Sequence, residues 1–174
     1  MFIISIALII VLTAIDQLLK FLVVKNIDFG EIIKVIKFGS HDIFSLTHIT
    51  NEGAAWSLMA GKTWFLIGLP LIVIAGALFY MFRKQKESKL QLVSLSMIIA
   101  GGLGNLIDRI RIKKVVDYIL FEPVDFPVFN FADICVVVGA VLFCIYIIVI
   151  EEIQNKKKKS AEKAPVEENS DEQA

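Results

Sequence analysis

The chain has 174 residues, of which 56 % are hydrophobic, and its 18 lysine and arginine residues balance its 18 aspartate and glutamate residues. A composition this apolar excludes an ordinary soluble domain, because the apolar residues are too many for one core and must go into lipid. It also argues against a nucleic-acid partner, since no basic face interleaves with aromatic residues.

Four stretches of the chain are apolar and long enough to cross a membrane, which takes about 20 residues in a helix. They cover about residues 2–24, 63–82, 90–107 and 131–150. The first stretch lacks the basic start and the Ala-x-Ala-like cleavage site of a signal peptide, so we expect a retained span. The predicted fold class is therefore an all-α membrane protein with four transmembrane helices.

One loop and one tail account for most of the remaining chain. The loop covers about residues 25–62, and its runs Glu31–Phe38 and Ile43–Thr50 are rich in Ile, Val, Phe and Thr. A Gly-Ser-His-Asp turn between these runs predicts a small extracytoplasmic β-hairpin or sheet in this first loop. Residues 153–174 are charged and have no apolar period, which predicts a disordered cytoplasmic tail after a membrane domain of residues 1–152.

Basic residues in short connections predict the orientation, because they tend to stay on the cytoplasmic side. The connection Arg83–Lys89 and the run Lys156–Lys159 are both densely basic, which places both termini in the cytoplasm. The basic group at residues 109–114 then falls on the outer side, against the rule. The even number of spans and the other two clusters outweigh it.

Polar residues from three spans and from the loop are predicted to converge on one layer near the outer face. Asp16, for example, lies about 14 residues into the first span, or about 21 Å along a helix in a core about 30 Å thick. The converging residues are Asp16, Asn51, Trp56, Asn105, Asp108, Asn130 and Asp133. Neither solubility nor folding alone requires such a layer, so it is a candidate site.

Several of these residues also have a purely structural explanation. Asp16 and Lys20 are spaced i, i+4 and can form an ion pair. The two polar residues that close the third span can cap or stitch its end. Asn130 and Asp133 have the spacing of a helix N-cap and its N3 acid, where the helix dipole favours negative charge. The sequence leaves these alternatives open.

Asp117 has no such explanation. It precedes the fourth span by a short loop, with Val115, Val116 and Tyr118 around it. Desolvation among apolar side chains favours a protonated acid. Because a carboxyl group near the membrane is costly unless it has a partner or a role, and because Asp133 can meet it across the loop, we predict acid–base chemistry by this pair.

Five segments of the chain resemble the lipoprotein signal peptidases, the signal peptidase II family. They are Asp16–Lys20, Thr50–Trp56, Gly101–Arg109, Val115–Tyr118 and Phe129–Asp133. All five occur in the family's order and at its spacing, and the size and the four spans match as well. The resemblance extends from the start of the chain to about Ile150.

The resemblance implies an aspartic intramembrane protease of the bacterial cytoplasmic membrane, with its active site near the outer face. Its substrate would be a prolipoprotein whose lipobox cysteine carries diacylglycerol, cut just before that cysteine. Asp117 and Asp133 match the catalytic pair. The positions that match substrate-binding or supporting residues, or adjoin them in the matching segments, are Asp16, Lys20, Asn51, Gly53, Trp56, Asn105, Asp108, Arg109 and Asn130. The family implies no metal or other cofactor and inhibition by the peptide antibiotic globomycin.

Other functions and properties stay open at the level of the residues. A small proton-coupled transporter also uses intramembrane acids, although carriers tend to have inverted repeats and a site at the midplane. A non-catalytic membrane scaffold would tolerate Asp117→Asn and Asp133→Asn. We expect a monomer, because four spans can enclose a site within one chain.

Overall fold

The computed structural model describes residues 2–53, 63–83 and 88–162. Within these residues the chain forms four helices and three strands in the order α1, β1, β2, α2, α3, β3, α4. The helices are α1 (Phe2–Asn26), α2 (Thr63–Arg83), α3 (Lys89–Ile112) and α4 (Phe131–Glu162), and the strands are β1 (Ile32–Phe38), β2 (His41–Asn51) and β3 (Val115–Phe121).

In the part of the chain that the structure describes, these four helices are each long and apolar enough to cross a membrane. The predicted spans are therefore confirmed, although α1 continues to Asn26 and α3 to Ile112. The polar residues at these ends do not stop a helix, because adding a turn to an existing helix costs far less than starting one.

The central helix is α3, which packs against α1, α2 and α4. In the most apolar 18-residue stretch of each helix, 56 % of the residues of α3 are buried, against 17 % in each of the other three helices. The outer three helices therefore present most of their apolar side chains to lipid. A Cβ atom on Gly101 would collide with the backbone oxygen of Ala132. The helix pair α3–α4 therefore depends on a small residue at its closest approach.

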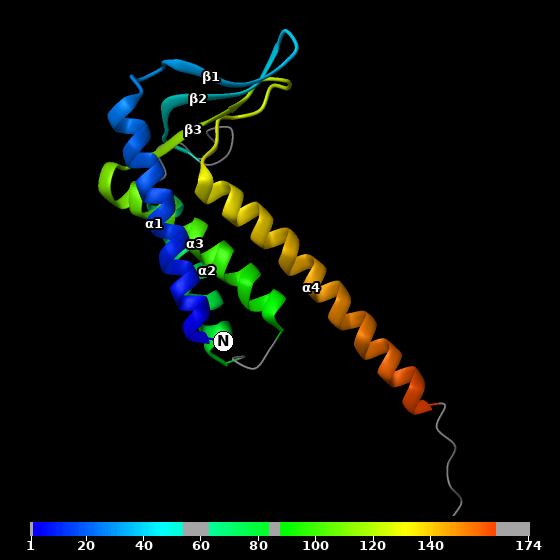
Figure 1. Cartoon of the computed structure of the whole chain (residues 1–174). Coiled ribbons are helices and arrows are strands. Elements are labelled where there is room, and N and C mark those ends of the chain that lie inside the picture. Colours follow the sequence, from blue (N-terminus) through cyan, green and yellow to red (C-terminus); the bar gives the residue numbers. More distant parts are fainter. Residues whose placement is uncertain (1, 54–62, 84–87, 163–174) are drawn as a thin grey trace, which may run out of the picture.

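The three strands form an antiparallel sheet in the order β1-β2-β3, at the opposite end of the helices from the N-terminus (Figure 1). The predicted hairpin is confirmed, and Gly39 takes a positive φ of 61° in its two-residue turn. The third strand was not predicted: residues 115–121 form β3 and pair with β2. A buried segment needs partners for its backbone groups, and the free edge of β2 supplies them.

The predicted disorder of residues 153–174 needs a correction at its start. Helix α4 continues to Glu162, so residues 153–162 are helical, and residues 163–174 lie outside the described residues. Glu152 and Lys156, spaced i, i+4, form an ion pair at 2.8 Å that favours this continuation.

Candidate active site

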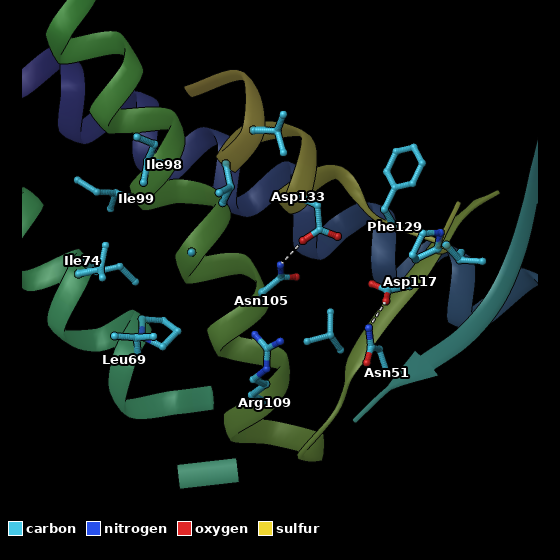
Figure 2. Close-up of a pocket in the computed structure, with 18 of the residues that line it drawn as sticks. Asn51, Leu69, Ile74, Ile98, Ile99, Asn105, Arg109, Asp117, Phe129 and Asp133 are labelled. Carbon is cyan, nitrogen blue, oxygen red and sulfur yellow. Dashed lines mark hydrogen bonds between the residues drawn. The ribbon is translucent and has the colours of Figure 1, made fainter. Parts of the chain in front are cut away.

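Two carboxyl groups from different elements line one cavity where the helices meet the sheet (Figure 2). Asp117 comes from β3 and Asp133 from the first turn of α4. The cavity has a volume of about 530 Å³. Its walls are largely apolar and come from α2, α3 and α4, with Ile74, Ile99 and Val136 among them. The cavity thus combines a polar end with a long apolar wall.

The carboxyl group of Asp117 is almost fully buried, with 3 % of the residue exposed. The side-chain amide of Asn130 donates to its Oδ1 at 2.6 Å, and that of Asn51 donates to its Oδ2 at 3.2 Å. Burial, with a further contribution from the charge of Asp133, raises the pKa of Asp117 from its ordinary value of 3.8 to about 6. The two amide donors oppose this rise, because they favour the ionised form.

The carboxyl group of Asp133 is held by two donors as well. The side-chain amide of Asn105 donates to its Oδ1 at 2.7 Å, and the backbone N–H of Asn130 donates to its Oδ2 at 3.1 Å. In return, the backbone N–H of Asp133 donates to Oδ1 of Asn130 at 3.0 Å. This reciprocal pair is the helix cap that the spacing predicted.

Asn130 connects the two carboxyl groups. Its side chain is fully buried, and its Nδ2 also donates to Oδ1 of Asn105 at 3.1 Å. Capping α4 and holding the site are therefore not alternatives for this residue. Its side-chain oxygen accepts from the helix start and its side-chain nitrogen donates to Asp117, while its backbone N–H donates to Asp133.

The predicted ion pair of Asp16 and Lys20 is present, with Nζ and Oδ2 3.0 Å apart. Lys20 also pairs with Asp108 at 2.9 Å and donates to Oδ1 of Asn105 at 3.0 Å. The structural explanation is thus correct for these residues. It does not exhaust their role, because the same lysine contacts an amide that holds Asp133.

The remaining predicted residues lie on α3 and at the end of β2. Arg109 lines the cavity, and its guanidinium donates to the backbone oxygen of Gly53 at 3.1 Å. The backbone N–H of Gly53 donates to Oδ1 of Asn51 at 2.9 Å, which turns the Asn51 amide nitrogen toward Asp117. Trp56 lies outside the described residues.

Sequence reasoning missed two polar contributors. The hydroxyl oxygen of Tyr118 accepts from the backbone N–H of Phe131 at 3.2 Å, and so helps to hold the start of α4 beside β3. The amide of Gln17 donates to Asp16 and Asp108. Both residues directly follow a predicted site acid, and a polar side chain beside a buried acid is a signal that could have found them.

The sequence of this chain is similar to those of known membrane peptidases. The sequence model of the signal peptidase (SPase) II family matches residues 8–149. The lipoprotein signal peptidase of Clostridium tetani is 39 % identical over 145 residues, which cover 82 % of this chain and 90 % of the relative. That of Lactococcus lactis subsp. cremoris is 42 % identical over 148 residues, covering 85 % and 95 %. The chain belongs to the signal peptidase II family.

Solved structures of bacterial membrane enzymes share the fold. One, determined by the in meso method at 2.3 Å resolution, superposes with a TM-score of 0.77 at 30 % identity and covers 87 % of this chain and 90 % of its own. A second, at 1.9 Å, gives a TM-score of 0.74 at 30 % identity over 82 % and 91 %. As a member of the signal peptidase II family, the chain is a multi-pass membrane peptidase, and these relatives do not support a transporter.

Proposed function

We propose that this chain is an aspartic endopeptidase that removes the signal peptide from diacylglyceryl-modified prolipoproteins and cuts before the lipidated cysteine. The observation that carries the proposal is the pair Asp117 and Asp133 on one cavity, each with both oxygens held by N–H donors. Two carboxyl groups that share one proton at a cleft are the machinery of aspartic proteases, which need neither a metal nor a covalent nucleophile.

The proposed reaction uses one ionised and one protonated carboxyl group, which act as a coupled pair. We assign the proton to Asp117, because burial and the neighbouring charge raise its pKa to about 6. Asp133 takes a proton from water as the water oxygen attacks the scissile carbonyl carbon, while Asp117 donates a hydrogen bond to the carbonyl oxygen. The amide C–N bond then breaks, and the proton passes to the leaving nitrogen.

The cavity suits a substrate that is part peptide and part lipid. Its polar end carries Asn51 and Arg109 beside the acids, and its apolar wall runs along the lipid-facing helices. A peptide backbone can bind at the first, and acyl chains can lie along the second, without leaving an apolar environment. The link from Arg109 to Gly53 supports contact between the Gly53–Trp56 segment and the substrate. Globomycin would inhibit by filling the same cavity.

We place this protein in the bacterial cytoplasmic membrane, as a monomer with both termini in the cytoplasm and the active site near the outer face. The basic connection Arg83–Lys89 and the basic run after the fourth span support this orientation. The site lies at the sheet end of the molecule, away from the N-terminus (Figure 1).

The test is cleavage of a purified diacylglyceryl prolipoprotein by the detergent-solubilised protein. We expect Asp117→Asn and Asp133→Asn each to lower the rate by about 10²–10⁴-fold, the usual contribution of a general acid or base. Asp125→Asn, an exposed acid in the neighbouring turn, is the matched control and should cut at the normal rate. Normal cleavage by both folded site variants would refute the aspartic mechanism. If folded wild-type protein left the prolipoprotein uncut, the proposed substrate class would be wrong.

A further inference from the structure

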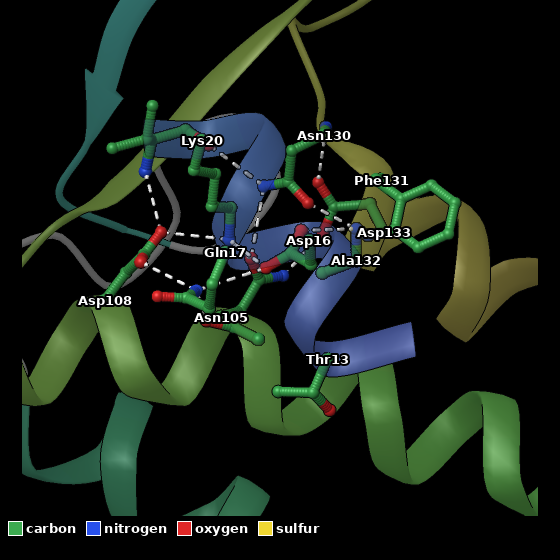
Figure 3. Close-up of polar contacts among 12 residues, drawn as sticks. Thr13, Asp16, Gln17, Lys20, Asn105, Asp108, Asn130, Phe131, Ala132 and Asp133 are labelled. Carbon is green, nitrogen blue, oxygen red and sulfur yellow. Dashed lines mark hydrogen bonds and ion pairs between the residues drawn. The ribbon is translucent and has the colours of Figure 1, made fainter. Parts of the chain in front are cut away.

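A buried ion cluster lies behind the cavity and outside its lining. Its members are Asp16 and Lys20 on α1 and Asp108 on α3 (Figure 3). The three side chains are only 1–6 % exposed, and the lysine contacts both carboxylates, at 3.0 and 2.9 Å. Burying three charges is expensive, so the cluster calls for an explanation beyond stability.

The two carboxylates of this cluster also bind backbone groups at corresponding places. Oδ1 of Asp16 accepts from the N–H of Ala132 at 3.0 Å, and Ala132 directly precedes Asp133. Oδ2 of Asp108 accepts from the N–H of Val116 at 3.2 Å, and Val116 directly precedes Asp117. Each carboxylate therefore holds the residue before one member of the pair.

We infer that Asp16, Lys20 and Asp108 form an ionic bridge that sets the separation of Asp117 and Asp133. The inference rests on the proposed function, since it assigns these three as positioning residues for that reaction. One end of the bridge holds the start of α4 and the other holds the start of β3. Lys20 joins the two ends, so it determines how far apart the two carboxyl groups lie.

Lys20 acts on the site in a second way, through an amide. Oδ1 of Asn105 faces two donors, Nζ of Lys20 at 3.0 Å and Nδ2 of Asn130 at 3.1 Å. This arrangement leaves only the Asn105 nitrogen to face Asp133, to which it donates at 2.7 Å. Without the ammonium group, the amide loses one of the two contacts that fix its orientation.

The bridge is tightly enclosed. The amide of Gln17 donates to Asp108 and to the backbone oxygen of Gly104, both at 3.1 Å. A Cβ atom on Gly104 would collide with the Asp16 carboxylate. Gly104→Ala therefore displaces one end of the bridge without changing any charge.

The first experiment compares Lys20→Met with Lys25→Met, an exposed lysine on the same helix, in the prolipoprotein cleavage assay. We expect Lys20→Met and Gly104→Ala to lower kcat by about 100-fold, because a shift of about 1 Å at a reacting pair costs that much. KM should stay within about twofold, since the bridge does not line the cavity. Normal kcat in folded Lys20→Met would overturn the inference.

A neutral triple variant separates positioning from mere stability. Asp16→Asn, Lys20→Met and Asp108→Asn together remove all three charges, so no buried charge is left without its partner, which is the main cost of a single replacement. We expect Lys20→Met alone to lower Tm and the triple variant to have a Tm close to that of wild type. The kcat of the triple variant should stay at least about 10-fold below that of wild type. If kcat recovers together with Tm, the cluster only stabilises the fold and the inference fails.

A second experiment does not depend on activity. Cysteines replace Asp117 and Asp133 in a background without Cys135 and Cys144, and a short thiol-reactive cross-linker reports how fast the pair is joined. Lys20→Met should change that rate by at least about threefold, and Lys25→Met should not. An unchanged rate refutes the bridge whatever the enzyme does. A changed rate, beside normal cleavage by Asp117→Asn, supports the bridge and refutes the catalytic proposal.

Discussion

Removing the charge of Asp117 should change how stability depends on pH. Its pKa rises from 3.8 to about 6 on folding, so the native state binds the proton more tightly than the unfolded chain. Stability from this group is therefore fully present below about pH 4 and is lost as the pH rises to about 6. The loss at neutral pH amounts to about 3 kcal/mol, at about 1.4 kcal/mol for each pH unit of the shift.

The variant to measure is Asp117→Asn, which cannot ionise. Its amide oxygen can accept from only one of the two amides, those of Asn51 and Asn130, that reach Asp117. The lost acceptor costs about 1–3 kcal/mol at every pH, so the stability difference at a single pH does not decide the matter. The change in that difference with pH does decide it, because the lost hydrogen bond cancels.

Chemical unfolding in mild detergent, at about pH 4.5 and about pH 7.5, measures this change. Relative to wild type, we expect Asp117→Asn to gain about 2 kcal/mol between the two pH values, since about 1 of the 3 kcal/mol is already lost at the lower one. Asp125→Asn, in the exposed turn, should show no such gain. Parallel curves for wild type and Asp117→Asn would refute the argument that burial controls this carboxyl group.

Three further changes test the packing. Gly101→Ala should destabilise the protein by about 1–3 kcal/mol, because its new methyl group meets the backbone of α4, and unchanged unfolding would contradict that close approach. Ser45→Ala removes a 2.8 Å hydrogen bond to Glu122 across β2 and β3 and should cost about 1 kcal/mol in the same assay. Gln91→Met should stabilise by about 1–3 kcal/mol, since the fully buried Gln91 amide has no hydrogen-bond partner among the described residues, and a loss of stability would reveal a partner.

Local patterns in the chain were enough to predict several features correctly. The i, i+4 spacing of Asp16 and Lys20 predicted their ion pair, and the i, i+3 spacing of Asn130 and Asp133 predicted the helix cap. Both depend on the geometry of one helix, which a sequence specifies directly. The convergence of polar residues near one end of the spans followed from their depth along each helix.

Other features lay beyond such patterns. The strand β3 was not predicted, because its strand partner, β2, comes from a different part of the chain and no turn joins them. Residues 153–162 were predicted as disordered, because their composition is polar. They are helical because α4 continues through them from the apolar span. Nothing in the spacing of Asp108 showed that it would accept from Val116.

The sequence by itself determined the four spans, the hairpin and the residue types available for chemistry, because apolar length, strand period and turn residues act over a few positions. The tertiary structure decided which polar groups meet. Asp16 binds the N–H of Ala132 across 116 positions of the chain, and Asp117 reaches the cavity only because β3 pairs with β2. These contacts depend on how closely α3 packs against its neighbours and on strand register, and both emerge from packing many side chains at once.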